Sequence, residues 1–404
     1  MYNIDMKTEL ERNSYLNKLI EFKDTEFIKV ITGVRRSGKS SILRLFEQHL
    51  LSSNIDKSQI IFMNFEHPDF QNYLDDKSLY EYLLKYTTEN KKYYFLFDEI
   101  QEVDSWQKLI NGLRLKFECD IYITGSNANL LSGELSTYLS GRYVEIKVMP
   151  LSFKEFLVFK NYNDTTKIDL YYNEYIKNGA FPSVALLNNE NIIDDVIKGI
   201  YNSIILKDVM LRGNIKDGYL LEKLVAFIFD NIGNSVTSNS IANTLNANGL
   251  KTRNETIDAY LQLLENSFII YKAHRFNIRG KEHLKSQPKY YCVDIGLRNI
   301  SIGRNRGNFG SVLENIVYLE LIRRGYEVSI GKLDSLEIDF VCTKPNETIY
   351  YQVAYDMPKE SDRETSNLLK IPDSYKKVVI TANRMVTGNI DGIEIIHITD
   401  FLLK

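Results

Sequence analysis

The sequence predicts an α/β fold built on a parallel sheet, and three stretches support this prediction. The loop 33–40 lies between a short apolar run and a segment with apolar residues at helical spacing. The apolar run 93–97 leads directly into two carboxylates, and the run 120–124 leads into small polar residues. Buried parallel strands that end at one polar edge are typical of open α/β sheets. We therefore expect a ligand site at that edge.

The loop 33–40 fits the eight-residue phosphate-binding pattern and lies where that loop must lie. The run 27–32 predicts a strand before it, and 41–47 predicts a helix after it. Successive backbone N–H groups and the N-terminus of that helix would then face one anion. We expect the following residues to bind nucleotide phosphates: Gly33, Val34, Arg35, Arg36, Ser37, Gly38, Lys39, Ser40 and Ser41.

The residue types within this loop have mechanical reasons. Gly33 and Gly38 allow the backbone to approach phosphates at places where a Cβ atom would clash. Lys39 supplies a point charge to the β- and γ-phosphates. Ser40 offers its hydroxyl to Mg²⁺. The loop thus predicts a nucleotide-binding protein with Mg²⁺ as its metal.

The strand 93–97 and the two carboxylates after it are interpreted as the Walker B element. Asp98 would hold Mg²⁺ directly or through water. Glu99, one residue further on, would polarise the attacking water as a general base. An ordinary acidic strand end is the alternative for this pair taken alone.

Two further polar positions are candidates for sensing or stabilising the phosphate. Asn127, or Ser126 beside it, follows the strand 120–124 and could bond the γ-phosphate, although turn chemistry alone also favours this triplet. Arg142 precedes the strand 144–148, and its guanidinium suits the charge that develops on a phosphoryl group. A solvated or salt-bridged arginine is the alternative. An arginine acting in trans would require an oligomer.

Composition is that of an ordinary globular protein with more than one domain. The 404 residues are 44% hydrophobic and 25% charged, which predicts two to four domains. The formal net charge of −3 argues neither for nor against nucleic acid as a partner of the whole chain. No signal core and no run of 18 apolar residues is present, so we expect a cytoplasmic protein without a membrane partner. The three cysteines and five histidines show no metal-ligand or disulfide spacing.

The chain resembles the AAA-type ATPases of bacteria and archaea that carry a C-terminal domain with a nuclease-like fold. The resemblance spans nearly the whole chain. It rests on the motifs at 31–40, 97–101, 123–127, 141–143, 149–153, 179–182 and 337–340. It implies ATP rather than GTP as the nucleotide and an AAA-type P-loop ATPase core over residues 1–152.

Three more domains are expected after this core. Residues 153–215 read as a helical lid that packs on the nucleotide site. Residues 216–287 show the order helix, turn, helix and strands, which describes a winged helix. Residues 288–404 look like the restriction-endonuclease-like α/β core. The fold class expected for the whole chain is therefore α/β, a P-loop sheet with a lid, a winged helix and a nuclease-like domain.

The stretch 272–306 is rich in positive charge. It holds nine basic residues against Glu282 and Asp294: Lys272, Arg275, Arg279, Lys281, Lys285, Lys289, Arg298, Arg304 and Arg306. If these side chains shared one face, they would follow the phosphates of DNA or RNA. The alternative is a solvated loop or a docking surface for an acidic patch of the same chain.

The resemblance also implies a nuclease-like site, and the chain departs from it. Glu314 and Asp339 occupy two of the expected acidic places. Gln352 stands where the second strand's acid is expected, and Ala354 where its lysine is expected. A neutral amide does not replace a carboxylate's charge on a divalent ion, and alanine activates no water. We therefore expect no nuclease activity and a role in binding.

Three functions follow as alternatives. The favoured one is a Mg²⁺-dependent ATPase that acts as a nucleotide switch and repositions its C-terminal modules on a nucleic-acid or protein partner. The second is an ATP-dependent nuclease in DNA defence or repair. The third is a non-catalytic interaction protein that binds ATP and assembles with a partner protein or with further copies of itself.

Overall fold

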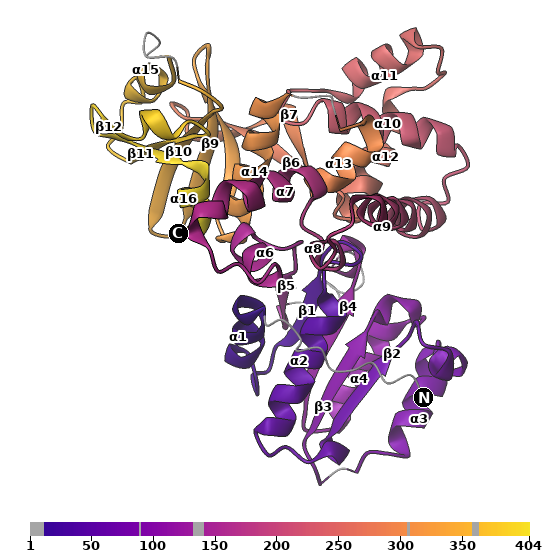
Figure 1. The fold of residues 1–404 in the computed structure, drawn as a ribbon. Coiled ribbons are helices and arrows are strands. Elements are labelled where there is room, and N and C mark those ends of the chain that lie inside the picture. Colours follow the sequence, from indigo (N-terminus) through magenta and orange to yellow (C-terminus); the bar gives the residue numbers. More distant parts are fainter. Residues whose placement is uncertain (1–11, 89, 132–140, 305–307, 358–362) are drawn as a thin grey trace. The chain divides into compact units, whose positions relative to one another are not determined.

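The computed structural model describes residues 12–404 except 89, 132–140, 305–307 and 358–362 (Figure 1). The chain divides into two compact units. The first unit comprises the described residues up to 149 together with 266–268, and the second comprises 150–265 and 269–404. No described helix combines the length and the apolar character that a membrane span requires.

The first unit is a five-stranded, fully parallel sheet between two layers of helices. The strand order is β2-β3-β4-β1-β5. The strands are β1 (Ile28–Thr32), β2 (Ile60–Asn64), β3 (Tyr93–Asp98), β4 (Cys119–Gly125) and β5 (Tyr143–Lys147). The helices are α1 (Asn13–Glu21), α2 (Lys39–Ser52), α3 (Asp76–Leu84) and α4 (Trp106–Lys116). This confirms the predicted α/β class with a parallel sheet.

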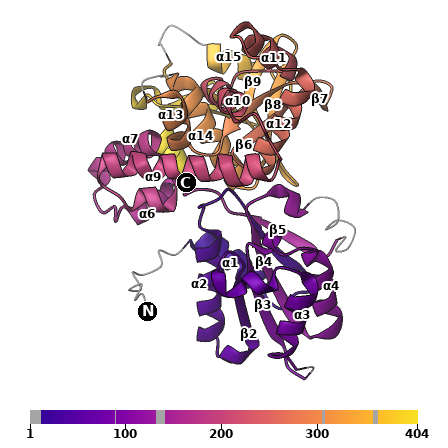
Figure 2. The same ribbon diagram turned by 90° about the vertical axis from the view of Figure 1, so that its right-hand side faces the viewer.

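Both faces of this sheet are buried, so every residue of β1 and β3 is buried and β3 is apolar up to Asp98. On one face α1 and α2 bury Leu19 and Phe46 against Leu96 and other strand residues. On the other face α3 and α4 bury Leu83 and Leu113 against the strands. Figure 2 shows the two helical layers on either side of the sheet. The two packed cores hold the carboxyl ends of all five strands at one edge.

The second unit is built on an eight-stranded mixed sheet of order β12-β13-β11-β10-β9-β8-β6-β7. Its strands are β6 (Ile270–Asn277), β7 (Glu282–Cys292), β8 (Glu327–Leu333), β9 (Leu336–Lys344), β10 (Glu347–Ala354), β11 (Lys376–Thr381), β12 (Gly388–Ile390) and β13 (Ile393–His397). Its first helices are α6 (Phe153–Phe159), α7 (Ile168–Asn178), α8 (Pro182–Ala185), α9 (Glu190–Ser203), α10 (Gly218–Asp230), α11 (Ser238–Ala247) and α12 (Asn254–Asn266). The later ones are α13 (Ile295–Ile302), α14 (Phe309–Arg323), α15 (Arg363–Leu369) and α16 (Ile398–Leu403), and a π-helical segment spans Ile204–Leu211. Figure 1 shows α14 lying against this sheet.

The division into two compact units is coarser than the four predicted domains, which stay a prediction. The change of unit falls at 149/150, close to the predicted end of the ATPase core at 152. The predicted boundary at 287/288 lies inside β7. The strands expected as a wing pair with each other, and β6 also pairs in parallel with β8. The physical reason is the burial of an aromatic side chain. Tyr291 of β7 is fully buried and stacks on Tyr318 of α14, with ring centroids 4.0 Å apart.

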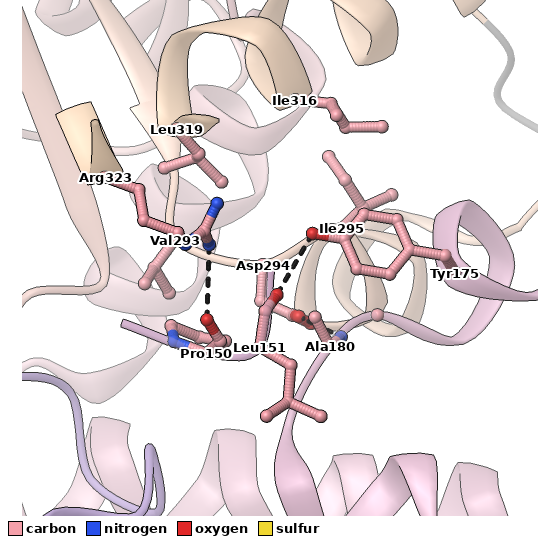
Figure 3. Close-up of a pocket in the computed structure, with 11 residues that line it drawn as sticks. Pro150, Leu151, Tyr175, Ala180, Val293, Asp294, Ile295, Ile316, Leu319 and Arg323 are labelled. Carbon is pink, nitrogen blue, oxygen red and sulfur yellow. Dashed lines mark hydrogen bonds between the residues drawn. The ribbon is translucent and has the colours of Figure 1, made fainter. Parts of the chain in front are cut away.

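A buried carboxylate ties the end of α7 to the start of α13 within the second unit. Asp294 accepts hydrogen bonds from the backbone N–H of Ala180 (2.6 Å) and of Leu297 (3.1 Å). Close by, the Tyr175 hydroxyl donates to the carbonyl of Leu151 (Figure 3). Burial raises the pKa of Asp294 to about 6, although the backbone donors act in the opposite direction.

This raised pKa predicts a pH-dependent stability. Because the folded chain holds the proton of Asp294 more tightly than the unfolded chain, the free energy of unfolding should fall as pH rises from 4 to 6, by about 3 kcal/mol from this group. Asp294→Asn should remove that part of the slope in urea unfolding followed by circular dichroism. Asp195→Asn, at an exposed position of α9, should retain it. An unchanged slope in Asp294→Asn would contradict this assignment.

Candidate nucleotide site

The phosphate-binding loop connects the carboxyl end of β1 to the N-terminus of α2. Gly33 and Gly38 have φ angles of +143° and +100°, in the region that glycine adopts without strain. A Cβ atom on Gly33 would lie 2.0 Å from the carbonyl oxygen of Val148. No side-chain acceptor caps α2, because its N-cap residue is Gly38. The exposed amides at this helix start form an anion-binding geometry.

The side chain of Lys39 is folded back over the loop. It is 3% exposed, and its Nζ donates to the carbonyls of Gly33 (3.1 Å) and Val34 (3.3 Å). The same Nζ lies 3.7 Å from Oε1 of Glu99. An ammonium held by weak carbonyl partners next to an anion site can move to a phosphate at little cost, because a charged partner is stronger.

Asp98 collects hydrogen bonds at the end of β3. Its Oδ1 accepts from the hydroxyls of Ser40 (3.0 Å) and Thr124 (2.6 Å), and its Oδ2 accepts from the Asn64 amide (2.7 Å). The residue is fully buried. Burial raises the pKa of its carboxyl and the negative charge of Glu99 raises it further, while the Thr124 hydrogen bond works in the opposite direction.

Glu99 is fixed by its backbone as well as its side chain. Its φ of +55° is unusual for a residue other than glycine, and its N–H donates to the Thr124 hydroxyl (2.9 Å). Its Oε2 accepts from Nε2 of Gln101 at 2.5 Å. The left-handed backbone turns the carboxylate back toward Lys39, as the 3.7 Å separation of their charged atoms shows.

The remaining loop and edge residues lie as follows. Arg35 donates to Glu66 (2.9 Å), which follows β2, whereas Arg36 is exposed with a φ of +66°. Ser126 and Asn127 are buried directly after β4, at the same sheet edge as the loop.

Arg142 lies at the other end of the sheet. β5 runs parallel to β1, with Tyr143 opposite Ile28 and Lys147 opposite Thr32, so a residue before β5 lies beside the start of β1. The backbone confirms this, because the N–H of Ile28 donates to the carbonyl of Arg142. At about 3.3 Å per strand residue, Arg142 is roughly 20 Å from Gly33, beyond the reach of an arginine side chain. This position argues against action in cis, an alternative that the sequence leaves open beside action in trans.

Four contributors were missed by sequence reasoning: Arg12, Asn64, Gln101 and Thr124. Of these four, Asn64 could have been found from the sequence, because it ends an apolar run as Asp98 does. No pattern in the sequence indicates a role for Arg12. It is 3% exposed, and its guanidinium donates to the carbonyls of Ser37 (2.7 Å) and Met149 (2.9 Å).

The donor set fits a magnesium ion. Ser40 and Asp98 present oxygen atoms within 3.0 Å of each other at the edge where phosphates would bind, and Mg²⁺ prefers few protein oxygens, water and phosphate oxygens. When bound, the ion would neutralise charge on the phosphates.

The nuclease-like residues lie in the second unit and are joined to a lysine. Lys289 of β7 forms ion pairs with Glu314 (3.0 Å) and Glu337 (2.9 Å), and the Tyr291 hydroxyl donates to Glu314. Burial lowers the pKa of Lys289, but Glu314, Asp339 and Glu337 raise it above its ordinary value. Burial and the charge of Glu314 raise the pKa of Asp339 well above its usual range.

Gln352 accepts from the backbone N–H of Asp339 (3.3 Å), so its carbonyl oxygen is already used, and Ala354 is buried. The described part of the chain holds no group of three histidine, cysteine, aspartate or glutamate side chains arranged for a metal ion.

The positive charges of 272–306 are dispersed rather than gathered. Lys289 and Arg298 are buried. Arg275, Arg279 and Arg304 form ion pairs with Glu337, Asp334 and Asp194. Arg306 and the Lys285 side chain lie outside the described residues. At least five of the nine cations therefore serve contacts within the chain, which leaves fewer of them for phosphates than the count along the sequence indicates.

Replacing Gly33 tests the loop geometry. Gly33→Ala should lower the free energy of unfolding by at least about 2 kcal/mol, because its Cβ would overlap a backbone carbonyl at a positive φ. Gly112→Ala is the matched control, since no atom lies within 4 Å of the added Cβ in α4. It should be neutral or stabilise by about 0.5–1 kcal/mol. Equal thermal-unfolding midpoints for the two variants would contradict the close approach at Gly33.

Two regions of the chain match known protein families, and known proteins are similar over most of its length. Residues 25–157 match the family described as AAA domain, and residues 169–307 match a domain of unknown function. A protein of Haemophilus influenzae, described as uncharacterized, is 49% identical to this chain over 401 residues. The match covers 98% of this chain and 100% of that protein.

A protein of Methanocaldococcus jannaschii, also described as uncharacterized, is 32% identical over 400 residues, with 95% of this chain and 88% of that protein covered. Among solved structures, a Walker-type ATPase of Pyrococcus abyssi is similar with 15% identity and a TM-score of 0.47, over 72% of this chain and 95% of that one. The two relatives show that this chain belongs to one family with them, and its residues 25–157 match the family described as AAA domain.

Proposed function

We propose that this protein binds ATP with Mg²⁺, hydrolyses it, and uses the cycle as a nucleotide switch. The observation that carries the proposal is the meeting of Lys39, Asp98 and Glu99 beside one glycine-bounded loop. An ammonium, a metal-binding carboxylate and a general base are the three groups that hydrolysis of a triphosphate requires. The match to the AAA-domain family supports ATP as the nucleotide.

In this proposal the phosphates displace the present partners of Lys39. The loop amides and the Lys39 ammonium bind the β- and γ-phosphates, while Ser40 and Asp98 hold Mg²⁺. Moving the ammonium away from Glu99 frees that carboxylate to accept a proton from water. The chain therefore keeps its general base occupied until a triphosphate is bound.

Two substitutions separate binding from hydrolysis. Lys39→Ala should abolish Mg²⁺-dependent phosphate release by weakening ATP binding about 100-fold or more, because the point charge is lost. Glu99→Gln should reduce turnover at least about 100-fold yet bind ATP with nearly wild-type affinity, because only the base is lost. Phosphate release and fluorescent-nucleotide titration measure the two effects.

Lys77→Ala, at an exposed position in α3, is the matched control and should resemble the wild type. Unaltered turnover in Glu99→Gln would contradict the role of that residue. Saturable ATP binding without any phosphate release from the wild type would instead support the non-catalytic interaction protein.

The switch part of the proposal is supported by Arg12. One guanidinium binds the carbonyl of Ser37 in the phosphate loop and the carbonyl of Met149, the last residue before the second unit begins. The guanidinium lies over the Tyr15 ring, and the Tyr15 hydroxyl accepts from the Met149 N–H (3.3 Å). A shift of the loop on phosphate binding would therefore reach the connection between the units.

The segment that connects the two units is also held by hydrogen bonds after Met149. Within the second unit the Arg323 guanidinium donates to the carbonyl of Pro150 (3.2 Å; Figure 3). The Leu151 N–H donates to the carbonyl of Ala180 (2.7 Å). The backbone of residues 149–151 is thus held by hydrogen bonds at each residue, so a displacement of Met149 would be transmitted along this segment rather than absorbed by it. This is the basis on which we propose coupling of the nucleotide state to the second unit.

Arg12→Met should uncouple the two units. Hydrogen exchange of peptides covering 148–153 should change on ATP addition in the wild type and much less in the variant, while ATP affinity stays within about threefold. Arg44→Met, which removes an arginine that lies over Phe62 in the same unit, should keep the wild-type response. An equal ATP-dependent change in Arg12→Met and wild type would argue against coupling through this residue.

For the second unit we propose a binding role without phosphodiester cleavage. The pairing of Lys289 with Glu314 and Glu337 supports this, because the carboxylates that would bind a metal ion are neutralised by an ammonium. The nuclease-like and winged-helix assignments stay proposals about this unit. For Arg142 we propose a role on the nucleotide of a second copy of the chain, which its exposed position next to the start of β5, away from its own phosphate loop, supports.

A further inference from the structure

The side-chain amide of Gln101 lies against the carboxylate of Glu99 and has one unused atom. Its Nε2 donates to Oε2 of Glu99 at 2.5 Å. Its Oε1 is buried and has no hydrogen-bond partner among the described residues. Buried polar atoms are rarely left without a partner, so an acceptor of this kind at a ligand-binding edge indicates a donor that arrives with the ligand.

The fold makes room for this amide at the end of β4. A Cβ atom on Gly125 would lie 2.5 Å from Oε1 of Gln101 and 3.0 Å from the nearest methyl carbon of Leu130. Any side chain at position 125 would therefore displace the amide. Gly125 is the residue directly before Ser126, so the amide lies at the sheet edge that carries the phosphate loop.

The orientation of the amide follows from the charge of Glu99. A carboxylate accepts hydrogen bonds only, so the NH₂ group must face it. The reversed amide would bring two acceptor oxygens together. The carbonyl oxygen is thereby directed away from Glu99 and toward Gly125, and it is left able to accept a hydrogen from a donor that enters with the ligand.

We propose that Gln101 is a positioning residue that holds the attacking water together with Glu99. The water donates one hydrogen to the Glu99 carboxylate and the other to Oε1 of Gln101, which leaves an oxygen lone pair for the γ-phosphorus. As the new P–O bond forms, the bond to the β–γ bridging oxygen breaks and its electron pair stays on ADP. Glu99 takes the proton from the water. This inference rests on the proposed ATPase function and adds a residue to its site.

Two variants test the role. Gln101→Met keeps the volume but removes both hydrogen bonds, and we expect kcat to fall roughly 10- to 100-fold with KM and Kd for ATP within about threefold. Gly125→Ala should reproduce the loss in Gln101→Met, because the added Cβ displaces the amide.

Gln107→Met, a substitution in α4, is the matched control and should leave kcat unchanged. A structural role alone would weaken ATP binding along with kcat, so nucleotide titration and circular dichroism of each variant accompany the kinetics. A wild-type kcat in Gln101→Met, or a Kd for ATP that rises as much as kcat falls, overturns the inference while leaving the ATPase intact. Absence of turnover in the wild type overturns the ATPase function and, with it, this inference.

Discussion

The buried carboxylate of Asp98 organises the candidate site. It accepts hydrogen bonds from Ser40 on α2, Thr124 on β4 and Asn64 on β2. Three elements therefore meet β3 at this one side chain. Burying this carboxylate is unfavourable, and three donors compensate for the lost water. The negative charge of Asp98 lies where Mg²⁺ would bind beside the phosphates, and the cation would balance that charge. The same hydrogen bonds that stabilise the sheet edge therefore set the geometry of the site.

The proposed general base, Glu99, is held in one position without a ligand. Lys39 and Gln101 flank its carboxylate, and its left-handed backbone places it between them. Strained backbone at such a residue is maintained only when its surroundings determine it, as the Thr124 hydroxyl on the Glu99 N–H does here. A triphosphate would compete for Lys39 alone. The remaining contacts would keep the base in place for water.

Much of the first unit could be predicted from the sequence because its signals are local. Strand β3 is an uninterrupted apolar run before two carboxylates, and the glycines of the loop are fixed by backbone conformation. The partners of Asp98 depend instead on the strand order β2-β3-β4-β1-β5, which places Asn64 and Thr124 on either side of Asp98. No local pattern contains that order. Arg12 lies farther still from the motif, and only tertiary packing brings it to Ser37.

The errors have equally physical causes. Arg142 was assigned by its proximity in sequence to strand β5, but in a parallel sheet the start of a strand lies opposite the ligand edge. The boundary at 287/288 followed the expected order of elements in a winged helix, whereas β7 continues through Tyr291 into a core shared with α14. The positive charges of 272–306 were counted along the chain, and Lys289 and Arg298 are turned into the interior.

The central claim is that loop amides, one ammonium and a chelated Mg²⁺ together bind a nucleoside triphosphate. Isothermal titration calorimetry of the full chain with ATP tests it most directly. The account predicts saturable binding of one ATP per chain that weakens strongly when Mg²⁺ is removed with EDTA. A natively folded protein that gives no binding heat at several temperatures, with any nucleoside triphosphate, would contradict it.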